Sequence, residues 1–237
     1  MRRLFLLVAA LFFIESGSSA QEIRRVEADF TDYLPLLRNA GYEVFSFDIS
    51  SLKDETYVIT FVTKEYVNNE LSHDSTGDPF TLNIVNKKMI SEFSKENQDI
   101  IISRNDAYDL ERGIYRLAEK ITIGFSPSEA DSLKAVRMSV ENLGSMGAQL
   151  SLKPLSIPGN VSWDGICKYQ VRPFRVGRIN IGGFTPLVLV GSMWYDKDFD
   201  IVRFCVDNEF EPDLSSKSLE FIPHYYVIGI NVVKQDS

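Results

Sequence analysis

The segment Tyr225–Val233 constrains the fold of this chain more than any other part of the sequence. Successive side chains of an extended strand point to opposite faces of a sheet, so an alternating apolar set marks one covered face. Here both sets are apolar, with Tyr226, Ile228, Ile230 and Val232 on one side and Tyr225, Val227 and Val233 on the other. We therefore expect this segment to lie in the middle of a sheet that is packed on both faces.

Most of the remaining sequence has the composition of short β-strands. The segments rich in β-branched and aromatic residues are 42–49, 56–66, 80–85, 100–103, 114–125, 133–140, 148–152, 186–195 and 199–206. We expect residues 50–55 to join the first two as an antiparallel hairpin, and Asp196-Lys197-Asp198 to join the last two. Many short strands with turns between them predict an all-β protein, with the antiparallel sheets of a β-sandwich or a jelly-roll.

One short N-terminal helix is expected at Asp32–Ala40. Asp32 can cap it, Pro35 falls in its first turn, and Gly41 follows as a stop signal. A second helical turn is expected at residues 126–129, where a capping box occurs. The sequence has no repeat and no Pro/Gly/Ser-rich linker, so we expect residues 21–237 to form a single domain, with position 105 as the place for any subdivision.

The first twenty residues have the order of a cleavable secretory signal. Arg2 and Arg3 precede the apolar run Leu4–Ile14, and the small residues Ser18-Ser19-Ala20 follow it. The run is shorter than the roughly 20 residues that span a membrane, so we expect cleavage after Ala20 and no transmembrane anchor. The two arginines leave a twin-arginine route as the alternative to general secretion. The expected location is the periplasm, the cell surface or the exterior.

The net charge and the absence of known catalytic motifs limit the classes of function that are open to this chain. The chain has 33 acidic against 25 basic residues, a net charge of −8, which opposes unspecific binding to nucleic acid or anionic lipid. It has no G-x-S-x-G, H-E-x-x-H, C-x-x-C or phosphate-loop motif. Only His73 and His224 supply imidazole, and we interpret His224 as a hydrogen-bonded structural residue and His73 as a solvated loop residue. No catalytic residue is predicted.

Several phrases of the sequence resemble a known family. They are Phe184–Asp196, Val140–Gly147, Phe221–Gly229 and the early block Asp32–Leu37. These stretches resemble a family of uncharacterised exported proteins from Bacteroidetes, a domain of unknown function. The resemblance implies an all-β fold and a Gram-negative envelope setting, and it supplies no activity and no catalytic residue.

The turn Asp196, Asp198 and Asp200 is the one candidate metal site. Its D-x-D-x-D spacing would place three carboxylates around a calcium ion. An EF-hand-type loop would have glycine at position 201 and a bidentate acid at 207, where this chain has Ile201 and Asp207. Solvated aspartates at the tip of a hairpin are the alternative interpretation.

Trp163 is the candidate ligand-binding residue. Its neighbours Asn160, Ser162, Asp164 and Gly165 indicate a loop, and an exposed indole can stack on a sugar ring. Trp194, Tyr195, Tyr225 and Tyr226 could extend such a platform, although for Trp194, Tyr225 and Tyr226 core packing is the favoured interpretation.

Cys167 and Cys205 could form a disulfide in an oxidising compartment. In the chain-entropy model, closing that loop contributes about 4 kcal/mol. Two unpaired, packed thiols are the alternative, because a domain of this length does not depend on a covalent link.

These features lead to three functional hypotheses. The first is an exported, non-enzymatic β-sandwich protein of the bacterial envelope or exterior that binds a glycan or a protein partner. The second is a carboxylate-based glycan hydrolase, since paired acids in a cleft leave no signature in sequence spacing. The third is a structural or fimbria-like assembly subunit. No cofactor other than calcium is suggested.

Overall fold

The computed structural model describes residues 25, 27, 29–53, 55–85, 94–103, 108–109, 114–127, 130–155, 167–204 and 207–235. Of residues 84–85, 101–103, 108–109 and 114–115 only the backbone is described. The chain divides into two units, residues 1–36 and residues 37–237. The predicted signal segment and part of the predicted turn at 126–129 lie outside the described residues.

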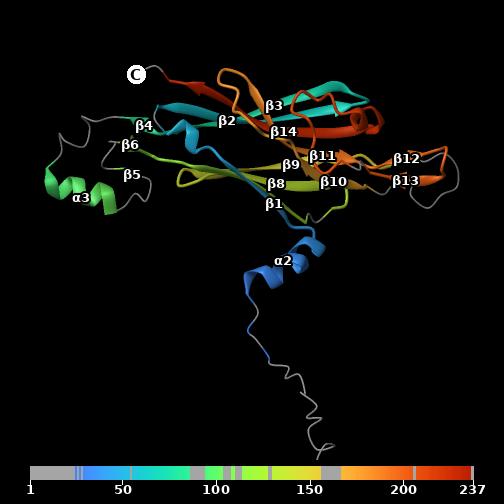
Figure 1. Cartoon of the computed structure of the whole chain (residues 1–237), viewed down its shortest axis with the longest axis horizontal. Coiled ribbons are helices and arrows are strands. Elements are labelled where there is room, and N and C mark those ends of the chain that lie inside the picture. The colour runs from blue at the N-terminus through green and yellow to red at the C-terminus, as the bar shows by residue number, and fades with distance from the viewer. Residues whose placement is uncertain are drawn as a thin grey trace, which may run out of the picture. The chain divides into compact units, whose positions relative to one another are not determined.

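Within the second unit, two antiparallel sheets lie in separate layers (Figure 1). Sheet A has four strands in the order β1 (Glu43–Asp48), β7 (Lys120–Ser126), β8 (Leu133–Val140) and β9 (Gly144–Ser151). Sheet B has five strands in the order β10 (Tyr169–Pro173), β11 (Phe184–Ser192), β14 (His224–Lys234), β2 (Tyr57–Val67) and β3 (Glu70–Leu82). The all-β, sandwich-like prediction is confirmed.

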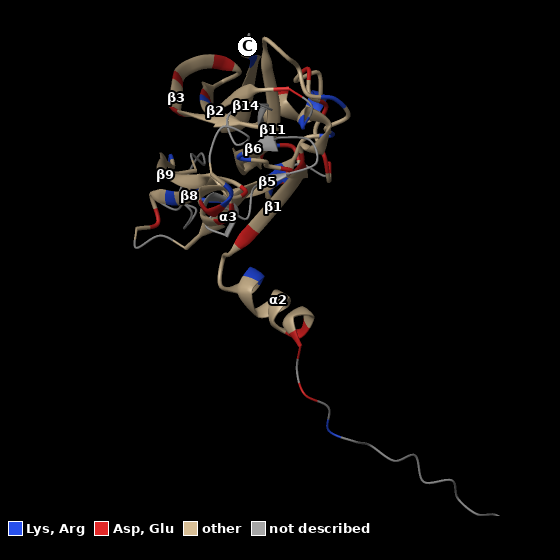
Figure 2. Ribbon diagram, turned by 90° about the vertical axis from the view of Figure 1, so that its left-hand side faces the viewer, with Lys and Arg blue, Asp and Glu red and all other residues tan. Residues whose placement is uncertain are grey.

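Smaller elements accompany the two sheets. A hairpin is formed by β12 (Trp194–Asp196) and β13 (Ile201–Arg203), and a second small sheet has the order β4 (Ile84–Val85), β6 (Ile114–Tyr115), β5 (Tyr108–Asp109). The helices are α2 (Phe30–Asn39), α3 (Lys95–Ser103) and the 3-10 turns η1 (Ser50–Leu52) and η2 (Lys217–Phe221). None of the helices that the structure describes combines the length and apolar character that a membrane crossing requires. The charged positions of β1 and β3 are acidic, whereas those of β8 are basic (Figure 2).

Strand β14 is the centre of sheet B, as its two apolar faces predict. It pairs with β11 on one side and with β2 on the other. Its inward residues enter the main core between the sheets, where the buried side chains include Ile59, Phe61, Ile121, Ile123, Phe125, Val136, Met138, Val188, Val190, Ile228, Ile230 and Val232. Its outward residues pack under the segment before the strand, in a second cluster of Phe174, Leu189, Phe210, Leu219, Ile222, Tyr225 and Val227. Only Val233, which is 55 % exposed, departs from the prediction.

The predicted hairpin at residues 50–55 is wrong. Strand β1 pairs with β7 in sheet A, whereas β2 pairs with β14 and β3 in sheet B. The connection carries η1, and its apolar residues Ile49 and Leu52 are buried in the main core. Because Ile49 and Leu52 are buried between the sheets, the connection crosses from one layer to the other, and β1 and β2 belong to different sheets.

Two further local predictions are wrong. Residues 100–103, which were expected to be a strand, form the end of α3. At the start of this helix Ser94 Oγ accepts the amide proton of Asn97 at 3.4 Å. The segment around His73, which was expected to be a loop, lies within β3, because the long strand β2 supplies it with backbone partners. His73 is nevertheless exposed there, opposite Glu65.

The predicted N-terminal helix is present but begins two residues early. Asp29, rather than Asp32, accepts the amide proton of Thr31, at 2.7 Å from Oδ1. At the other end Gly41 has φ +87°, and its amide donates to the carbonyl of Arg38 at 2.9 Å. Only glycine adopts this conformation without strain, so the expected stop signal acts as a C-terminal cap.

Candidate functional site

A row of polar side chains crosses one end of sheet B. Tyr169 on β10 lies opposite Ser192 on β11, and His224 on β14 lies opposite Val67 on β2. The backbone amide of His224 donates to Ser192 Oγ at 3.3 Å, so Ser192 stands between the other two. Because serine is small, the Tyr169 and His224 side chains meet above it, and the Tyr169 hydroxyl is hydrogen bonded to His224 Nδ1.

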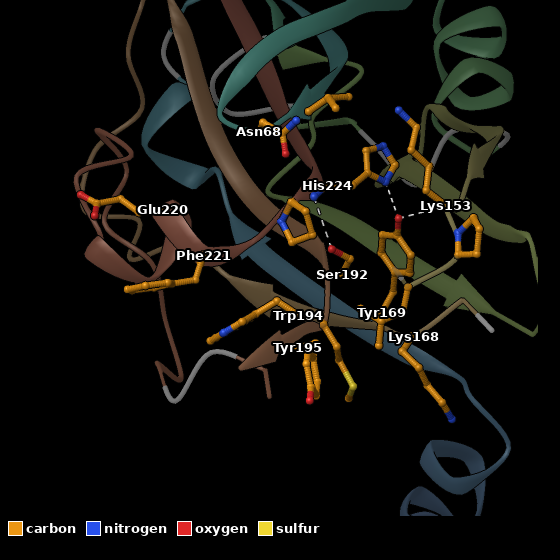
Figure 3. Close-up of a pocket in the computed structure, with 15 residues that line it drawn as sticks. Asn68, Lys153, Lys168, Tyr169, Ser192, Trp194, Tyr195, Glu220, Phe221 and His224 are labelled. Carbon is orange, nitrogen blue, oxygen red and sulfur yellow. Dashed lines mark hydrogen bonds between the residues drawn. The ribbon is translucent and has the colours of Figure 1, made fainter. Parts of the chain in front are cut away.

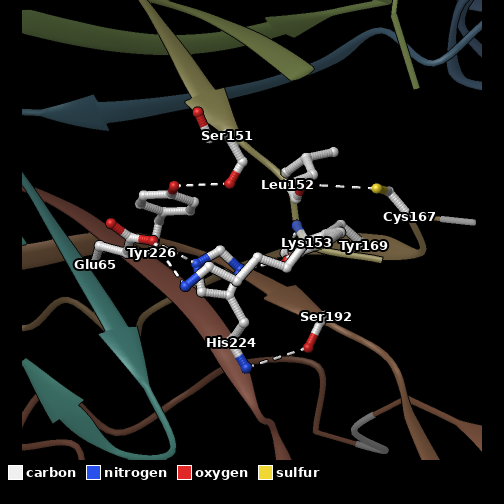
Figure 4. A network of polar contacts seen from close by, with 9 residues as sticks. All are labelled: Glu65, Ser151, Leu152, Lys153, Cys167, Tyr169, Ser192, His224 and Tyr226. Atoms are coloured by element: carbon white, nitrogen blue, oxygen red, sulfur yellow. Dashed lines mark hydrogen bonds and ion pairs between the residues drawn. The ribbon is translucent and has the colours of Figure 1, made fainter. Parts of the chain in front are cut away.

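The other ring nitrogen of His224 faces an acid (Figure 4). Nε2 lies 2.8 Å from Glu65 Oε1, and Lys153 Nζ lies 3.5 Å from the same oxygen. The backbone amide of Lys153 donates to the Tyr169 hydroxyl at 2.9 Å. Tyr226, two residues along β14, donates its hydroxyl proton to the carbonyl of Ser151 on β9 at 2.8 Å. This network therefore links both sheets.

The contacts fix the proton positions near neutral pH. Burial lowers the pKa of His224 against the opposing influence of Glu65, so the ring is uncharged. Burial alone would raise the pKa of Glu65, but the hydrogen bond from His224 and the positive charge of Lys153 lower it overall. The ionised carboxylate only accepts, so Nε2 carries the proton and Nδ1 accepts from Tyr169. Burial raises the pKa of Tyr169 and raises that of Tyr226 to about 12, which keeps both phenols protonated.

The network does not form a nucleophilic triad. Ser192 Oγ contacts the backbone amide of His224 rather than its imidazole, so His224 is not placed as a base for this hydroxyl. The His224 side chain is only 3 % exposed and both of its nitrogens are engaged. It therefore supports the surrounding wall and is not free to take a proton from a substrate.

A pocket of about 520 Å³ opens beside this network. Figure 3 shows Phe221 and Glu220 on one side of it and Tyr169 and Lys168 on the other. We call it the His224 pocket. Its lining residues are Val67, Asn68, Lys153, Pro154, Leu155, Lys168, Tyr169, Ser192, Met193, Trp194, Tyr195, Glu220, Phe221, Pro223 and His224.

Two stacked aromatic rings form part of that lining. Trp194 at the start of β12 and Phe221 at the end of η2 lie 5.9 Å apart between ring centroids, with 21° between their planes. Trp194 is half-buried against the outer cluster of sheet B, whereas Phe221 is 59 % exposed. The packing predicted for Tyr225 and Tyr226 is as expected, since both are buried. Trp194 both packs against the outer cluster of sheet B and lines the pocket.

Two of the three aspartates in the predicted calcium turn have partners for their carboxylates. Asp196 Oδ2 lies 2.8 Å from Arg203 Nε, and Asp196 Oδ1 accepts the amide proton of Asp198 at 3.1 Å. Asp200 accepts a hydrogen bond from the Tyr195 hydroxyl. Among the residues that the structure describes, no group of three or more acids, histidines or cysteines is arranged to hold a metal ion. Calcium binding by Asp196, Asp198 and Asp200 stays a prediction without geometric support.

Two other predicted sites fall on residues that are not described. Trp163 lies outside the described residues, and so does Cys205. Cys167 Sγ lies 3.6 Å from the carbonyl oxygen of Leu152, and burial raises the pKa of its thiol. Glycan stacking by Trp163 and the disulfide therefore stay predictions.

Several residues of the pocket and its network escaped sequence analysis, namely Glu65, Lys153, Lys168, Tyr169 and Phe221. Phe221 gave one usable signal, because it is an aromatic residue outside any alternating strand pattern and next to a proline-containing turn. Glu65 gave another, as the one acid in a strand that is mostly apolar. Nothing in the sequence placed Tyr169 near His224, since the strand register alone brings them together.

The fold and the site define an antiparallel, two-layered β protein with an aromatic-walled pocket at one end of its larger sheet. Over residues 12–234 the sequence matches the model of a family described as a domain of unknown function, DUF5041, and the chain belongs to that family. No curated protein and no solved structure gave a significant match.

Proposed function

We propose that this protein is an exported carbohydrate-binding protein, and that the His224 pocket holds the sugar. The stacked pair Trp194 and Phe221 is the observation that carries this proposal. A flat aromatic surface covers the apolar face of a pyranose ring, while polar groups at the rim accept and donate hydrogen bonds to its hydroxyls.

The polar rim supports the same ligand class. Asn68, Lys153 and Glu220 are exposed at the pocket and offer both donors and acceptors. Beneath them the Glu65–His224–Tyr169 network keeps the wall fixed, so little conformational entropy is lost on binding. A rigid aromatic wall with mixed polar groups suits a neutral, hydroxyl-rich molecule better than a strongly charged one.

Binding rather than hydrolysis is favoured by the arrangement of acids. Glu220 is the only acid among the described residues that line the His224 pocket, whereas hydrolysis through carboxylates requires two that face one another. The acids of the neighbouring hairpin, Asp196 and Asp198, come from a single turn, and Asp196 is already paired with Arg203. These contacts support a non-enzymatic role.

Export is proposed from the first twenty residues and from the resemblance to exported Bacteroidetes proteins. Expression of the full chain in a Gram-negative cell, followed by fractionation and N-terminal sequencing, tests it. We expect a product that begins at Gln21 outside the cytoplasm. An unprocessed chain retained in the cytoplasm would contradict export.

A glycan array tests the carbohydrate proposal directly. We expect the purified protein to bind a defined subset of glycans, and Phe221→Ala to lower affinity by at least about tenfold through loss of ring stacking. The matched control is Phe30→Ala, because Phe30 is 69 % exposed on α2 and absent from the pocket lining. Failure to bind any glycan, or equal binding by the Phe221 variant, would refute the proposal.

A further inference from the structure

A second pocket of about 580 Å³ adjoins the His224 pocket. We call it the hairpin pocket, because its remaining lining comes from the β12–β13 hairpin. The two pockets share Trp194, Tyr195 and Phe221. The stacked aromatic pair therefore forms a ridge between two hollows of similar volume, rather than the end wall of one.

The ridge is suited to a chain of rings that passes over it. The Trp194 and Phe221 planes are nearly parallel, and Phe221 is largely exposed. A ligand of a single ring covers one side of this ridge and leaves the other side empty. A chain of linked rings fills both hollows and covers the apolar ridge between them, which buries more apolar surface without any change in the protein.

The hairpin pocket has a wall held in place by its own contacts. Arg203 lies 2.8 Å from Asp196 across the hairpin, and its guanidinium carbon lies 4.6 Å from the centre of the Phe199 ring. Asp200 accepts a hydrogen bond from the Tyr195 hydroxyl, which fixes one of the shared aromatic residues. Lys197 and Asp198 are exposed at the hairpin tip and present a donor and an acceptor toward this hollow.

We infer that the two pockets are subsites of one extended site for an oligosaccharide, with one sugar residue or more in each pocket and the Trp194–Phe221 ridge between them. This inference rests on the proposed function and narrows it from sugar binding to recognition of a chain. The hairpin subsite adds affinity only for ligands long enough to pass the ridge.

The test is a series of oligosaccharides of increasing length from cellulose, xylan and chitin, measured by isothermal titration calorimetry with the full chain. For the series that binds, we expect affinity to rise by at least about tenfold between the monosaccharide and the first length that crosses the ridge. Further residues should add little. Affinity that is independent of length would overturn the inference while leaving sugar binding intact.

Paired variants assign the two subsites. The double variant Lys197→Ala, Asp198→Ala removes exposed groups that line only the hairpin pocket, and Glu220→Gln alters a group that lines only the His224 pocket. We expect the hairpin variant to weaken long oligosaccharides several-fold and to leave the monosaccharide unchanged. Glu220→Gln should weaken every length alike.

Two other results have distinct meanings. If the hairpin variant binds all lengths as the parent does, the hairpin pocket is not a subsite and the inference fails. If no series binds at any length, both the inference and the proposed function fail. Because the altered side chains are exposed, unchanged thermal unfolding of each variant shows that folding is not the cause.

Discussion

His224 Nε2 and Glu65 Oε1 lie 2.8 Å apart, from neighbouring strands β14 and β2. The contact is unusual for its place, because it lies at one end of the interior face of a sheet whose other inward side chains are mostly apolar. A buried polar group is tolerated only where its donors and acceptors are satisfied. Here Tyr169, Lys153 and the Glu65 carboxylate together supply those partners.

Stability should fall on acidification through His224. Burial lowers its pKa below the ordinary value of 6.5, so below that pH the unfolded chain binds a proton that the folded chain does not. The stability that depends on a neutral His224 is therefore fully present above pH 6.5. It is lost as the pH falls toward the pKa of His224 in the folded protein, with a slope of up to about 1.4 kcal/mol per pH unit. Glu65, whose pKa is also lowered, adds a further loss below its ordinary value of 4.5.

Urea unfolding at a series of pH values measures this dependence. His224→Gln should reduce the pH dependence of the unfolding free energy below pH 6.5, because glutamine does not titrate but can still donate a hydrogen bond to Glu65. His73→Gln is the control, since His73 is exposed on β3. Parent and His224→Gln slopes that agree within error would contradict the assignment.

Removal of the Tyr169 hydroxyl should destabilise the fold. Tyr169→Phe leaves the backbone amide of Lys153 and Nδ1 of His224 without this partner. We expect a loss of about 1–3 kcal/mol in the free energy of unfolding, the usual cost of buried unsatisfied groups. The exposed Tyr42 provides the comparison, and Tyr42→Phe should change stability by less than about 0.5 kcal/mol. Equal effects of the two variants would mean that the network contributes little.

Gly229 on β14 should not tolerate a side chain. A Cβ at this position would lie 2.2 Å from the carbonyl oxygen of Thr185 and 2.7 Å from the Phe184 ring. Because the first of these atoms belongs to the backbone of β11, the strands must separate to relieve the clash. We expect Gly229→Ala to cost about 1–3 kcal/mol or more by overpacking. Gly177→Ala is the matched control, with nothing within 4 Å of its Cβ, and thermal unfolding of both gives the answer.

Truncation along β14 should follow burial rather than hydrophobicity. Ile228 is fully buried in the main core, so Ile228→Ala should cost about 2–5 kcal/mol. Val233, near the end of the same strand, is 55 % exposed, and Val233→Ala should cost less than about 0.5 kcal/mol. Chemical denaturation distinguishes them, and comparable losses would show that the strand end is more covered than the fold implies.

The candidate site was only partly accessible from sequence. Trp194, Tyr195 and His224 stand out as aromatic or titratable residues in a chain with few histidines and tryptophans. Tyr169 and Phe221 do not, because 55 residues separate Tyr169 from His224 and only the register of β10, β11 and β14 joins them. A spatial neighbour of this kind has no local signature.

The sequence by itself determined which side chains must be buried and where many strands run. The alternation in β8, the apolar character of both faces of β14 and the turn after Asp196 sufficed for that, since each reflects the geometry of a single strand or hairpin. Only the tertiary structure decided that β1 leaves β2 for the other layer, and that Glu65, Tyr169 and His224 meet beside a pocket. An apolar pattern predicts that one face of a strand is buried, but many other strands could pack against that face. Which strand does so depends on the packing of the whole core.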